Sequence, residues 1–334
     1  MTERTRNVAV LGAGSWGTAL AMQVARGQNP VCLWGIDTEQ LSVMAEQRCN
    51  PFYLPDISFP DSLRLNPDLG ATLADADILL VVVPSHAMRS FIQSARPHIR
   101  SDHLVVWATK GLEEGSGKLM HQIIAEELGD VTATAVVSGP TFALEVAKNL
   151  PTAVTVASSS HEIAQQVVDF LHHGNFRAYT CEDVVGVELG GSLKNVLAIA
   201  AGIADGLGFG ANTRAALITR GLTEIMRLGQ AMGAQHETFM GLAGLGDLVL
   251  TCTDNQSRNR RMGLKLAEGR SVEQAREEIG QAVEGIKTAR EAWQLGQQYT
   301  VELPIIEQTY QVLYEAKSPK AAVEDLLSRD AKPE

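Results

Sequence analysis

The pattern of hydrophobic and polar positions divides the chain near residue 185. Before that point, short unbroken apolar runs alternate with segments whose apolar residues recur at helical spacing. Such runs are typical of strands that are buried on both faces of a parallel sheet. The runs predict strands at Val8–Leu11, Pro30–Trp34, Ile78–Val83, Leu104–Ala108, Ala133–Val137 and Pro151–Ala157.

Helical patterns separate several of these strands, at Thr18–Arg26, Met88–Ala95 and Lys118–Leu128. Strands that alternate with helices predict an α/β fold with a Rossmann-type doubly wound sheet. After residue 185 the pattern is mostly helical. The helices predicted there are Val187–Ile203, Thr213–Met232, Arg260–Glu268, Val272–Ile279, Gly285–Gln298 and Leu303–Tyr314.

The length of the chain also indicates two domains. Its 334 residues exceed the roughly 250–300 residues at which a single hydrophobic core usually stops growing. We therefore predict a doubly wound domain over residues 1–186 and an all-helical domain over residues 187–330. At the boundary the spacing of apolar residues changes from that of strands and helices to that of helices alone. No flexible linker, internal repeat or low-complexity segment marks it.

Composition narrows the possible partners and the compartment. The 28 basic and 39 acidic residues give a formal net charge of −11, which argues against general nucleic-acid binding. No stretch approaches about 18 uninterrupted apolar residues, so we expect no membrane span. The apolar run Val8–Leu11 is too short for a signal-peptide core, which predicts a cytoplasmic protein. Free thiols in a reducing compartment are expected for the cysteines Cys32, Cys49, Cys181 and Cys252.

A glycine motif, Gly12-x-Gly14-x-x-Gly17, follows the first predicted strand and opens the first predicted helix. In that context the three glycines allow a tight turn, a close approach of a pyrophosphate, and tight packing of helix on strand. The helix N-terminus adds N–H donors for phosphate. The motif predicts that the first domain binds a dinucleotide; the alternative is a glycine-rich turn without a ligand. Ser15 and Trp16 lie where a cofactor would pass, although Trp16 could equally be a packing residue.

Asp37 stands 20 residues after Gly17, at the end of the second predicted strand. A carboxylate there often accepts a hydrogen bond from a ribose 2′-hydroxyl and repels a 2′-phosphate, which favours NAD over NADP. Asp37 could instead cap a helix. Gly35 and Ile36 leave no arginine that could hold a 2′-phosphate.

Two lysines stand out by their position. Lys110 comes just beyond the carboxyl end of a predicted parallel strand, where such sheets bind ligands. Lys194 interrupts a long apolar helix, so it should have a partner or a lowered pKa, and a lysine of that kind can exchange a proton in carbonyl reduction. The alternatives are a solvated Lys110 and a Lys194 that extends from the helix flank to water. Neighbouring Gly190 and Gly191 indicate a close approach to this helix.

Two further segments carry polar chemistry. Asp247 ends a loop of small residues, where it could pair with Lys194, cap a following helix, or do both. The stretch Thr251–Arg261 holds three arginines together with serine and asparagine, and it precedes a helix. Guanidinium groups and helix N–H groups bind phosphate, so we predict an anion site here; the alternative is a solvated basic turn.

Seven motifs together resemble one enzyme family. They are GAGSWGTALA (12–21), WATKGLE (107–113), SGPTFA (138–143), LGGSLKNVLAI (189–199), DGLGFGANTRAALITRGL (205–222), GLAGLGDLVLTCT (241–253) and SRNRR (257–261). Over essentially its full length, the chain resembles the bacterial-type NAD(P)-dependent glycerol-3-phosphate dehydrogenases.

The resemblance implies roles for individual residues. Lys194 is implied to be the proton donor and acceptor at the substrate C2 oxygen, with Lys110 and Asp247 in the same catalytic site and Asn195 and Thr251 as second candidates. The implied substrate contacts are Lys110, Gly139, Thr141, Lys194, Asp247, Ser257, Arg258 and Asn259. The implied cofactor contacts are Gly12, Gly14, Ser15, Trp16, Gly17, Lys110, Ala143, Arg258 and Glu284.

The implied reaction is direct hydride transfer between NAD(P)H and dihydroxyacetone phosphate, with a protonated Lys194 at the developing alkoxide. No metal is expected to take part. The resemblance also implies a homodimer and a role in making the glycerol phosphate backbone of phospholipids. Members of the family often carry a basic residue near position 35 or 36, so Gly35 and Ile36 leave the choice between NAD and NADP open.

Two other functions compete with this one. Another two-domain dehydrogenase, acting on a 3-hydroxy acid or a sugar acid phosphate, could also use a helix-borne lysine, but the Ser257–Arg261 cluster and the GLAGLGD segment argue against it. A nucleotide sensor without catalytic activity would keep the glycine loop, but the presence of Lys110, Lys194 and Asp247 argues against a sensor.

Overall fold

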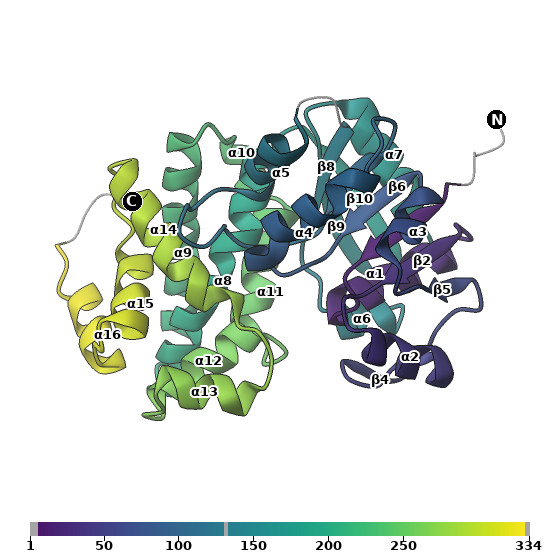
Figure 1. Cartoon of the computed structure of the whole chain (residues 1–334). Coiled ribbons are helices and arrows are strands. Elements are labelled where there is room, and N and C mark those ends of the chain that lie inside the picture. Colours follow the sequence, from purple (N-terminus) through teal and green to yellow (C-terminus); the bar gives the residue numbers. More distant parts are fainter. Residues whose placement is uncertain (1–5, 130–132, 331–334) are drawn as a thin grey trace. The chain divides into compact units, whose positions relative to one another are not determined.

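The computed structural model describes residues 6–129 and 133–330 (Figure 1). By contacts, the chain forms two compact units. Unit 1 extends to Thr109 and continues over Met120–Val187, while unit 2 consists of Lys110–Leu119 and the chain from Glu188 onward. The limits predicted for the two domains, residues 1–186 and 187–330, stay a prediction. The sequence did not predict that Lys110–Leu119 belongs to unit 2.

Unit 1 is built on an eight-stranded sheet with the strand order β10-β9-β8-β7-β6-β1-β2-β5. The six strands β8, β7, β6, β1, β2 and β5 are parallel to one another, whereas β9 pairs antiparallel with β8, and β10 is parallel to β9. The strands are β1 Val8–Leu11, β2 Val31–Trp34, β5 Leu63–Leu65, β6 Ile78–Val81, β7 Leu104–Trp107, β8 Ala133–Ser138, β9 Thr152–Ala157 and β10 Phe176–Cys181. The predicted Rossmann-type sheet is confirmed.

Connections run outward from β1 in both directions along the sheet, so helices cover both faces. The helices of unit 1 are α1 Ser15–Arg26, α2 Thr38–Gln47, α3 Leu69–Ala74, α4 Met88–Ala95, α5 Met120–Leu128, α6 Ala143–Ala147 and α7 His161–Leu171. Two 3-10 turns, η1 Ser85–Ala87 and η2 Arg96–His98, and a small hairpin, β3 Cys49–Asn50 with β4 Leu54–Ser58, complete unit 1.

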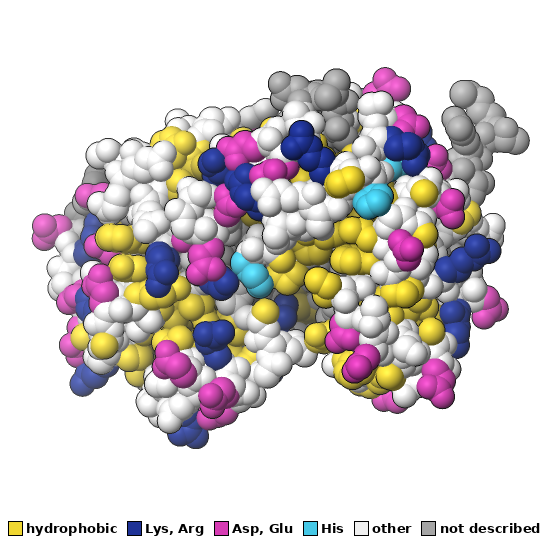
Figure 2. Space-filling view, viewed as in Figure 1, with side chains coloured by type: hydrophobic (Ala, Val, Ile, Leu, Met, Phe, Trp, Pro, Cys, Tyr) yellow, Lys and Arg dark blue, Asp and Glu magenta, His cyan; other side chains and the backbone are white. Residues whose placement is uncertain are grey.

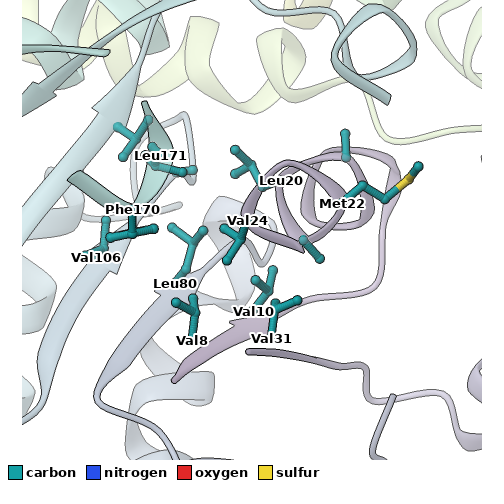
Figure 3. Packing of buried hydrophobic residues seen from close by; sticks show 14 of the residues in the cluster. Val8, Val10, Leu20, Met22, Val24, Val31, Leu80, Val106, Phe170 and Leu171 are labelled. Carbon is teal, nitrogen blue, oxygen red and sulfur yellow. The ribbon is translucent and has the colours of Figure 1, made fainter. Parts of the chain in front are cut away.

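The central strands are apolar at every position because both of their faces are covered. All four residues of β1, β6 and β7 are buried. Figure 3 shows Val24 of α1 close to Val10 of β1 and Leu80 of β6, and Leu20 of the same helix belongs to the same buried cluster. This packing fixes the start of α1 directly above the end of β1, where the glycine motif lies.

Two edge strands were not predicted from the sequence, β5 and β10. Both carry exposed charged residues next to buried ones, such as Arg64 in β5 and Arg177 in β10. An edge strand has one neighbour and more contact with water, so its sequence lacks the continuous apolar run that identifies a central strand.

Unit 2 contains no strand among its described residues and consists of helices, which confirms the predicted helical C-terminal domain. Its helices are α8 Val184–Gly206, α9 Ala211–Ala231, α10 His236–Phe239, α11 Asp247–Thr253, α12 Arg258–Ala267, α13 Val272–Ile279, α14 Glu284–Gln298, α15 Pro304–Tyr314 and α16 Pro319–Leu327, with a π-helical turn η3 Leu242–Gly246 before α11.

Helix α8 is the central helix of unit 2. Among the described residues it is the single helix that is long and apolar enough to cross a membrane. However, 89% of its most apolar stretch is buried inside the protein, as in the core helix of a soluble protein. Glycines on α8 allow other backbones to approach: a Cβ at Gly190 would lie 2.5 Å from Ala243 O, and one at Gly202 would lie 2.1 Å from Arg260 O. The predicted close approach at Gly190 is therefore present.

A buried carboxylate joins α9 to α15. Glu224 is 1% exposed, and its two oxygens accept hydrogen bonds from the N–H groups of Ile305 (2.7 Å) and Ile306 (3.1 Å) in the first turn of α15. Burial raises the pKa of Glu224 to about 7, while the two N–H groups act in the opposite direction. The side chain thus satisfies two N–H groups that have no partner within their own helix.

We expect Glu224→Ala to lower the free energy of unfolding by about 2–5 kcal/mol, because it leaves two buried N–H groups without an acceptor and opens a cavity. Urea unfolding followed by circular dichroism measures the loss. Glu277→Ala, at an exposed position on α13, is the control and should change stability by less than about 0.5 kcal/mol. Equal urea midpoints for the two variants would contradict the capping role of Glu224.

Candidate active site

The glycine loop joins β1 to α1 and has the geometry of a phosphate-binding turn. Gly12 has φ +128°, and a Cβ on it would lie 2.6 Å from Val82 O. A Cβ on Gly17 would lie 1.9 Å from Gly12 O, so helix and loop pack without a side chain between them. In contrast, a Cβ on Gly14 would meet nothing within 4 Å. The loop is therefore tight on its inner side and open at Gly14, which fits the close approach of a pyrophosphate to the N-terminus of α1.

Two side-chain amides hold this loop in place. Gln40 Nε2 and Asn50 Nδ2 both donate to Ala13 O, at 2.9 and 3.1 Å, and Asn50 also donates to Thr18 Oγ1 at 2.8 Å. Neither amide was predicted from the sequence, since Gln40 lies on α2 and Asn50 on the small hairpin. A loop that must present its backbone to a ligand gains rigidity from such contacts.

Trp16 packs as a partly buried residue against the hydrophobic core of unit 1. Its indole Nε1 is buried and has no hydrogen-bond partner among the described residues. The packing role that the sequence left open is therefore present. Contacts of Ser15 and Trp16 with a cofactor stay predictions.

At the end of β2, Asp37 caps α2, because its Oδ1 accepts a hydrogen bond from Gln40 N at 2.9 Å. The capping alternative is thus observed, and a contact with ribose stays a prediction. A Cβ on Gly35 would lie 2.8 Å from Ala13 Cβ, so close packing on the glycine loop excludes an easy substitution there. Ile36 is 88% exposed, which makes it the position in this turn that is open to a larger side chain.

In unit 2, one carboxylate lies between two lysines. Asp247 is the first residue of α11 and is fully buried. Its Oδ1 accepts a hydrogen bond from Lys194 Nζ of α8, and its Oδ2 lies 2.7 Å from Lys110 Nζ. Lys194 Nζ also lies 3.0 Å from the hydroxyl of Thr251, which donates to Asp247 O at 2.6 Å. The pairing of Asp247 with Lys194 that the sequence indicated is present.

The environment of Lys194 weakens its hold on a proton. The residue is 6% exposed, and burial lowers the pKa of its ammonium to about 7. The negative charge of Asp247 partly offsets this shift, while the positive charge of Lys110 adds to it. An amine with a pKa near 7 can both donate and accept a proton at neutral pH, as general acid–base catalysis requires.

Close backbone packing brings Asp247 to Lys194. The preceding turn, η3, consists of small and apolar residues, and a Cβ on Gly244 would lie 2.1 Å from Phe239 O. On the other side, Gly190 of α8 admits Ala243 and Gly244. The small residues of GLAGLGD thus bring the start of α11 against α8, at the level where Lys194 projects. A π-helical turn at this point is typical of functional sites.

Neither a metal nor a reactive thiol is indicated among the described residues. No group of three His, Cys, Asp or Glu side chains there could hold a metal ion. Cys252 lies beside the cluster on α11, but burial raises the pKa of its thiol to about 12, so it stays protonated and unreactive. The other three cysteines are free thiols as well. The ion pairs of the cluster join the amines of Lys110 and Lys194 to the carboxylate of Asp247.

The predicted phosphate site begins at the N-terminus of α12. Ser257 is the N-cap, and its Oγ accepts a hydrogen bond from Arg260 N at 3.2 Å. Arg260 is 8% exposed; it forms an ion pair with Asp205 and donates from Nε to Asn255 Oδ1 at 3.1 Å. Of the three arginines in this stretch, Arg260 thus has a structural role that the sequence did not reveal.

Asn259 is also tied to its own unit. Its Nδ2 donates to Asn195 Oδ1 at 2.8 Å, and its Oδ1 accepts from Gly285 N at 2.9 Å. This places the start of α14, with Glu284 as its first residue, against α8 and α12. The Oδ1 of Asn259 and one Nδ2 hydrogen are used in this way, which leaves the second Nδ2 hydrogen for the predicted phosphate contact.

In unit 1 the remaining predicted residues follow β8. Gly139 has φ +151°, and a Cβ on it would lie 2.9 Å from Val154 Cα. Thr141 Oγ1 donates to Gly139 O at 3.1 Å, and Ala143 is the first residue of α6. These residues lie at the same edge of the sheet as the glycine loop, because β1 and β8 belong to its parallel part.

The surface agrees with the acidic composition. On the face shown in Figure 2, lysine and arginine side chains are interspersed with aspartate and glutamate, and no broad basic area is visible. This pattern does not resemble the basic stripe of a nucleic-acid-binding surface.

Comparison with known proteins agrees with the site. Residues 7–164 match the family model for the N-terminus of NAD-dependent glycerol-3-phosphate dehydrogenase, and residues 183–324 match the model for its C-terminus. A protein of Thioalkalivibrio sulfidiphilus named glycerol-3-phosphate dehydrogenase (NAD(P)+) is 57% identical over 327 residues, covering 98% of each chain. The protein of that name from Pseudoalteromonas translucida is 54% identical over 335 residues, covering 100% of both chains.

A solved structure is also similar. The crystal structure of glycerol-3-phosphate dehydrogenase from Coxiella burnetii has a TM-score of 0.94 and 47% sequence identity, covering 97% of this chain and 99% of the other. With both family models matched and relatives more than half identical over nearly the full length, the chain belongs to the NAD-dependent glycerol-3-phosphate dehydrogenase family.

Proposed function

We propose that this protein interconverts sn-glycerol 3-phosphate and dihydroxyacetone phosphate, using NAD or NADP as the hydride carrier. One observation carries the proposal: Lys194, buried and with a pKa lowered to about 7, is held by Asp247 beside Lys110. Reduction of a ketone needs a group that delivers one proton to oxygen at neutral pH. The family membership supplies the substrate and the cofactor class.

Unit 1 is the proposed cofactor-binding part. The open side of the glycine loop at Gly14 and the N-terminus of α1 would accept the pyrophosphate of the dinucleotide. The residues proposed to contact the cofactor are Gly12, Gly14, Ser15, Trp16, Gly17, Lys110, Ala143, Arg258 and Glu284. When bound, the nicotinamide supplies the hydride that converts the substrate ketone carbon to a secondary alcohol carbon.

Unit 2 is the proposed catalytic part. In the reducing direction, Lys194 gives a proton from Nζ to the substrate C2 oxygen as negative charge develops there. Asp247 holds the Lys194 ammonium in place, and Lys110 brings a second positive charge that stabilises the developing alkoxide. In the oxidising direction the neutral Lys194 amine takes the hydroxyl proton back.

Binding of the substrate phosphate would fix the position of the substrate in the site. We place it at the N-terminus of α12, where Ser257 has a hydroxyl hydrogen to donate and Arg258 brings a guanidinium group. Binding energy from a group remote from the reacting carbon can be used to lower the barrier there. The residues proposed to contact the substrate are Lys110, Gly139, Thr141, Lys194, Asp247, Ser257, Arg258 and Asn259.

The direct test is oxidation of NADPH and, separately, NADH by the purified protein with dihydroxyacetone phosphate, followed at 340 nm. Saturable oxidation supports the proposal, and the ratio of the two rates gives the cofactor preference. Absence of turnover in folded protein, together with activity on a 3-hydroxy acid or a sugar acid phosphate, would favour the rival dehydrogenase function. Cofactor binding without turnover on any of these substrates would favour a sensor.

The rate should depend on pH through Lys194. Since its pKa is about 7, kcat/KM for reduction of dihydroxyacetone phosphate should be level below pH 6 and fall about tenfold per unit above pH 8 as the proton is lost. Oxidation of glycerol 3-phosphate needs the neutral amine, so its kcat/KM should rise across the same range and level off above pH 8. Two pH profiles in a constant-ionic-strength buffer measure this. Profiles that move in the same direction would exclude Lys194 as the shared proton carrier.

The cellular setting is proposed from the family. The enzyme would act in the cytoplasm as a homodimer and supply glycerol 3-phosphate for phospholipid synthesis. Sedimentation velocity of the purified protein tests the dimer directly, and a single species at 35.9 kDa would contradict it.

A further inference from the structure

The segment that carries Lys110 departs from unit 1 and joins unit 2. We call Lys110–Leu119 the strap. It has no helix or strand and turns at Gly111, Gly115 and Gly117, with φ values of +138°, +85° and +66°. Irregular backbone of this kind needs external contacts to hold one conformation.

Besides the contact of Lys110 with Asp247, the strap contacts helices α8 and α14 of unit 2. Gly111 N donates to Ser192 Oγ of α8 at 2.9 Å, and Gly115 N donates to Glu291 Oε1 of α14 at 3.0 Å. An exposed ion pair joins Glu114 to Lys287, also on α14, at 2.6 Å. The hydrogen bonds to Ser192 and Glu291 lie inside the protein, since both side chains are 1% exposed.

Glu291 is an unusual residue for the core of a helical unit. Its Oε2 is buried and has no hydrogen-bond partner among the described residues, whereas its Oε1 accepts the hydrogen bond from the strap N–H of Gly115. Keeping a carboxylate buried is costly unless it is well bonded, and an apolar side chain would fill the same space at less cost. Glu291 therefore has a role other than packing, and its one directed contact leads to the strap.

We propose that Glu291 is a positioning residue for Lys110: it holds the strap through Gly115 N–H and so sets the Lys110 ammonium against Asp247. Gly115 lies five residues after Lys110, and Ser192 holds the strap between them at Gly111. The proposal rests on the function proposed above, because Lys110 matters there as the second positive charge beside the substrate oxygen.

Release of the strap should change the chemistry in a specific way. The charged and titratable groups that act on Lys194 are Asp247 and Cys252 of α11 and Lys110 of the strap. Lys110 lowers the pKa of Lys194 by repulsion. If Lys110 moves away, Asp247 is left to Lys194 alone, and the midpoint of the pH profile should move upward. Admission of water to Lys194 by a loosened fold would raise the midpoint as well, because burial is the main cause of the lowered pKa. The double-mutant cycle with Lys110→Ala therefore separates the two causes.

The test compares Glu291→Gln, which keeps an acceptor oxygen, with Glu291→Met and Glu291→Ala, which do not. We expect the Gln variant to retain activity within about threefold. The Met and Ala variants should lose about 10- to 100-fold in kcat/KM for dihydroxyacetone phosphate, because a displacement of about 1 Å in a catalytic group costs that order. The midpoint of their pH profile for kcat/KM should rise. Two variants are used so that the test can be made with the one that is folded at the assay temperature.

A double-mutant cycle with Lys110→Ala shows whether Glu291 acts through Lys110. In the Lys110→Ala background, Glu291→Met should cause no further loss beyond about twofold. The matched control is Lys287→Ala, which removes the exposed contact between the same helix and the same strap and should leave kcat/KM unchanged.

Two failures are distinguishable. If wild-type protein does not turn over dihydroxyacetone phosphate, the proposed function is wrong. If wild-type protein is active but the Met and Ala variants retain its activity and pH midpoint, or if their losses add fully to that of Lys110→Ala, Glu291 does not position Lys110.

Discussion

Lys194→Ala should reduce kcat/KM for dihydroxyacetone phosphate by about 10²- to 10⁴-fold, the usual contribution of one general acid. The substitution removes the group with a pKa of about 7 from a site in which Lys110 lies on the other oxygen of Asp247. The pH dependence centred near 7 should vanish with it. Cofactor oxidation measured from pH 6 to 9 checks both points.

Cofactor binding separates loss of chemistry from loss of fold. Lys194 is not among the residues proposed to contact the cofactor, and the glycine loop belongs to the other unit, so the Kd for NADH or NADPH should be unchanged in Lys194→Ala. Lys320→Ala, at an 81% exposed side chain on α16, controls for removal of a lysine charge and should match the wild type. A Lys194→Ala enzyme that keeps more than a tenth of the wild-type kcat/KM would show that another group delivers the proton.

Asp247→Asn should be the second large effect. The change keeps the shape of the side chain but removes the charge that faces two ammonium groups, and leaving a buried charge uncompensated costs about 3–5 kcal/mol. We expect a lower free energy of unfolding and a loss in kcat/KM of about 10²-fold or more.

The pH profile gives the sign of this effect. Asp247 raises the pKa of Lys194 against burial and against Lys110, so its removal should move the midpoint for reduction below pH 7. Asp61→Asn, at an exposed position in unit 1, serves as control and should change neither stability nor the profile. An Asp247→Asn profile that shifts to higher pH would be incompatible with the assigned ion pair.

The two predicted pH shifts run in opposite directions. Loss of Asp247 removes an attraction and lowers the Lys194 midpoint, whereas loss of the Glu291 contact with the strap removes a repulsion and raises it. Measured side by side, the two variants test whether Lys194 is poised between its two charged neighbours.

Several features of the protein follow from local sequence. The runs at Val8–Leu11, Ile78–Val83 and Leu104–Ala108 identified central strands because a strand covered on both faces is apolar at every position. The glycine motif was identifiable because three glycines between a strand and a helix have few structural uses. Lys194 was notable because a charge inside an apolar helix must be explained.

Other features depend on residues far apart in the chain. Gln40 and Asn50 hold Ala13 O, and Asn259 links Asn195 to Gly285, through amide groups that have no distinctive pattern of their own. The sequence does not distinguish Arg260 from the two other arginines of its segment. Its ion pair with Asp205 in the structure does.

The sequence by itself determined the alternation of strand and helix, the glycine loop and the candidacy of Lys194 and Asp247, since each depends on burial or backbone freedom within a short stretch. Only the tertiary structure decided that the strap leaves the first unit and that Glu291 holds it. It also decided that Asp247 bonds both lysines at once. The reason is physical: these contacts join residues that lie 53 to 176 positions apart, so they depend on how the helices pack, and local propensity does not contain that packing.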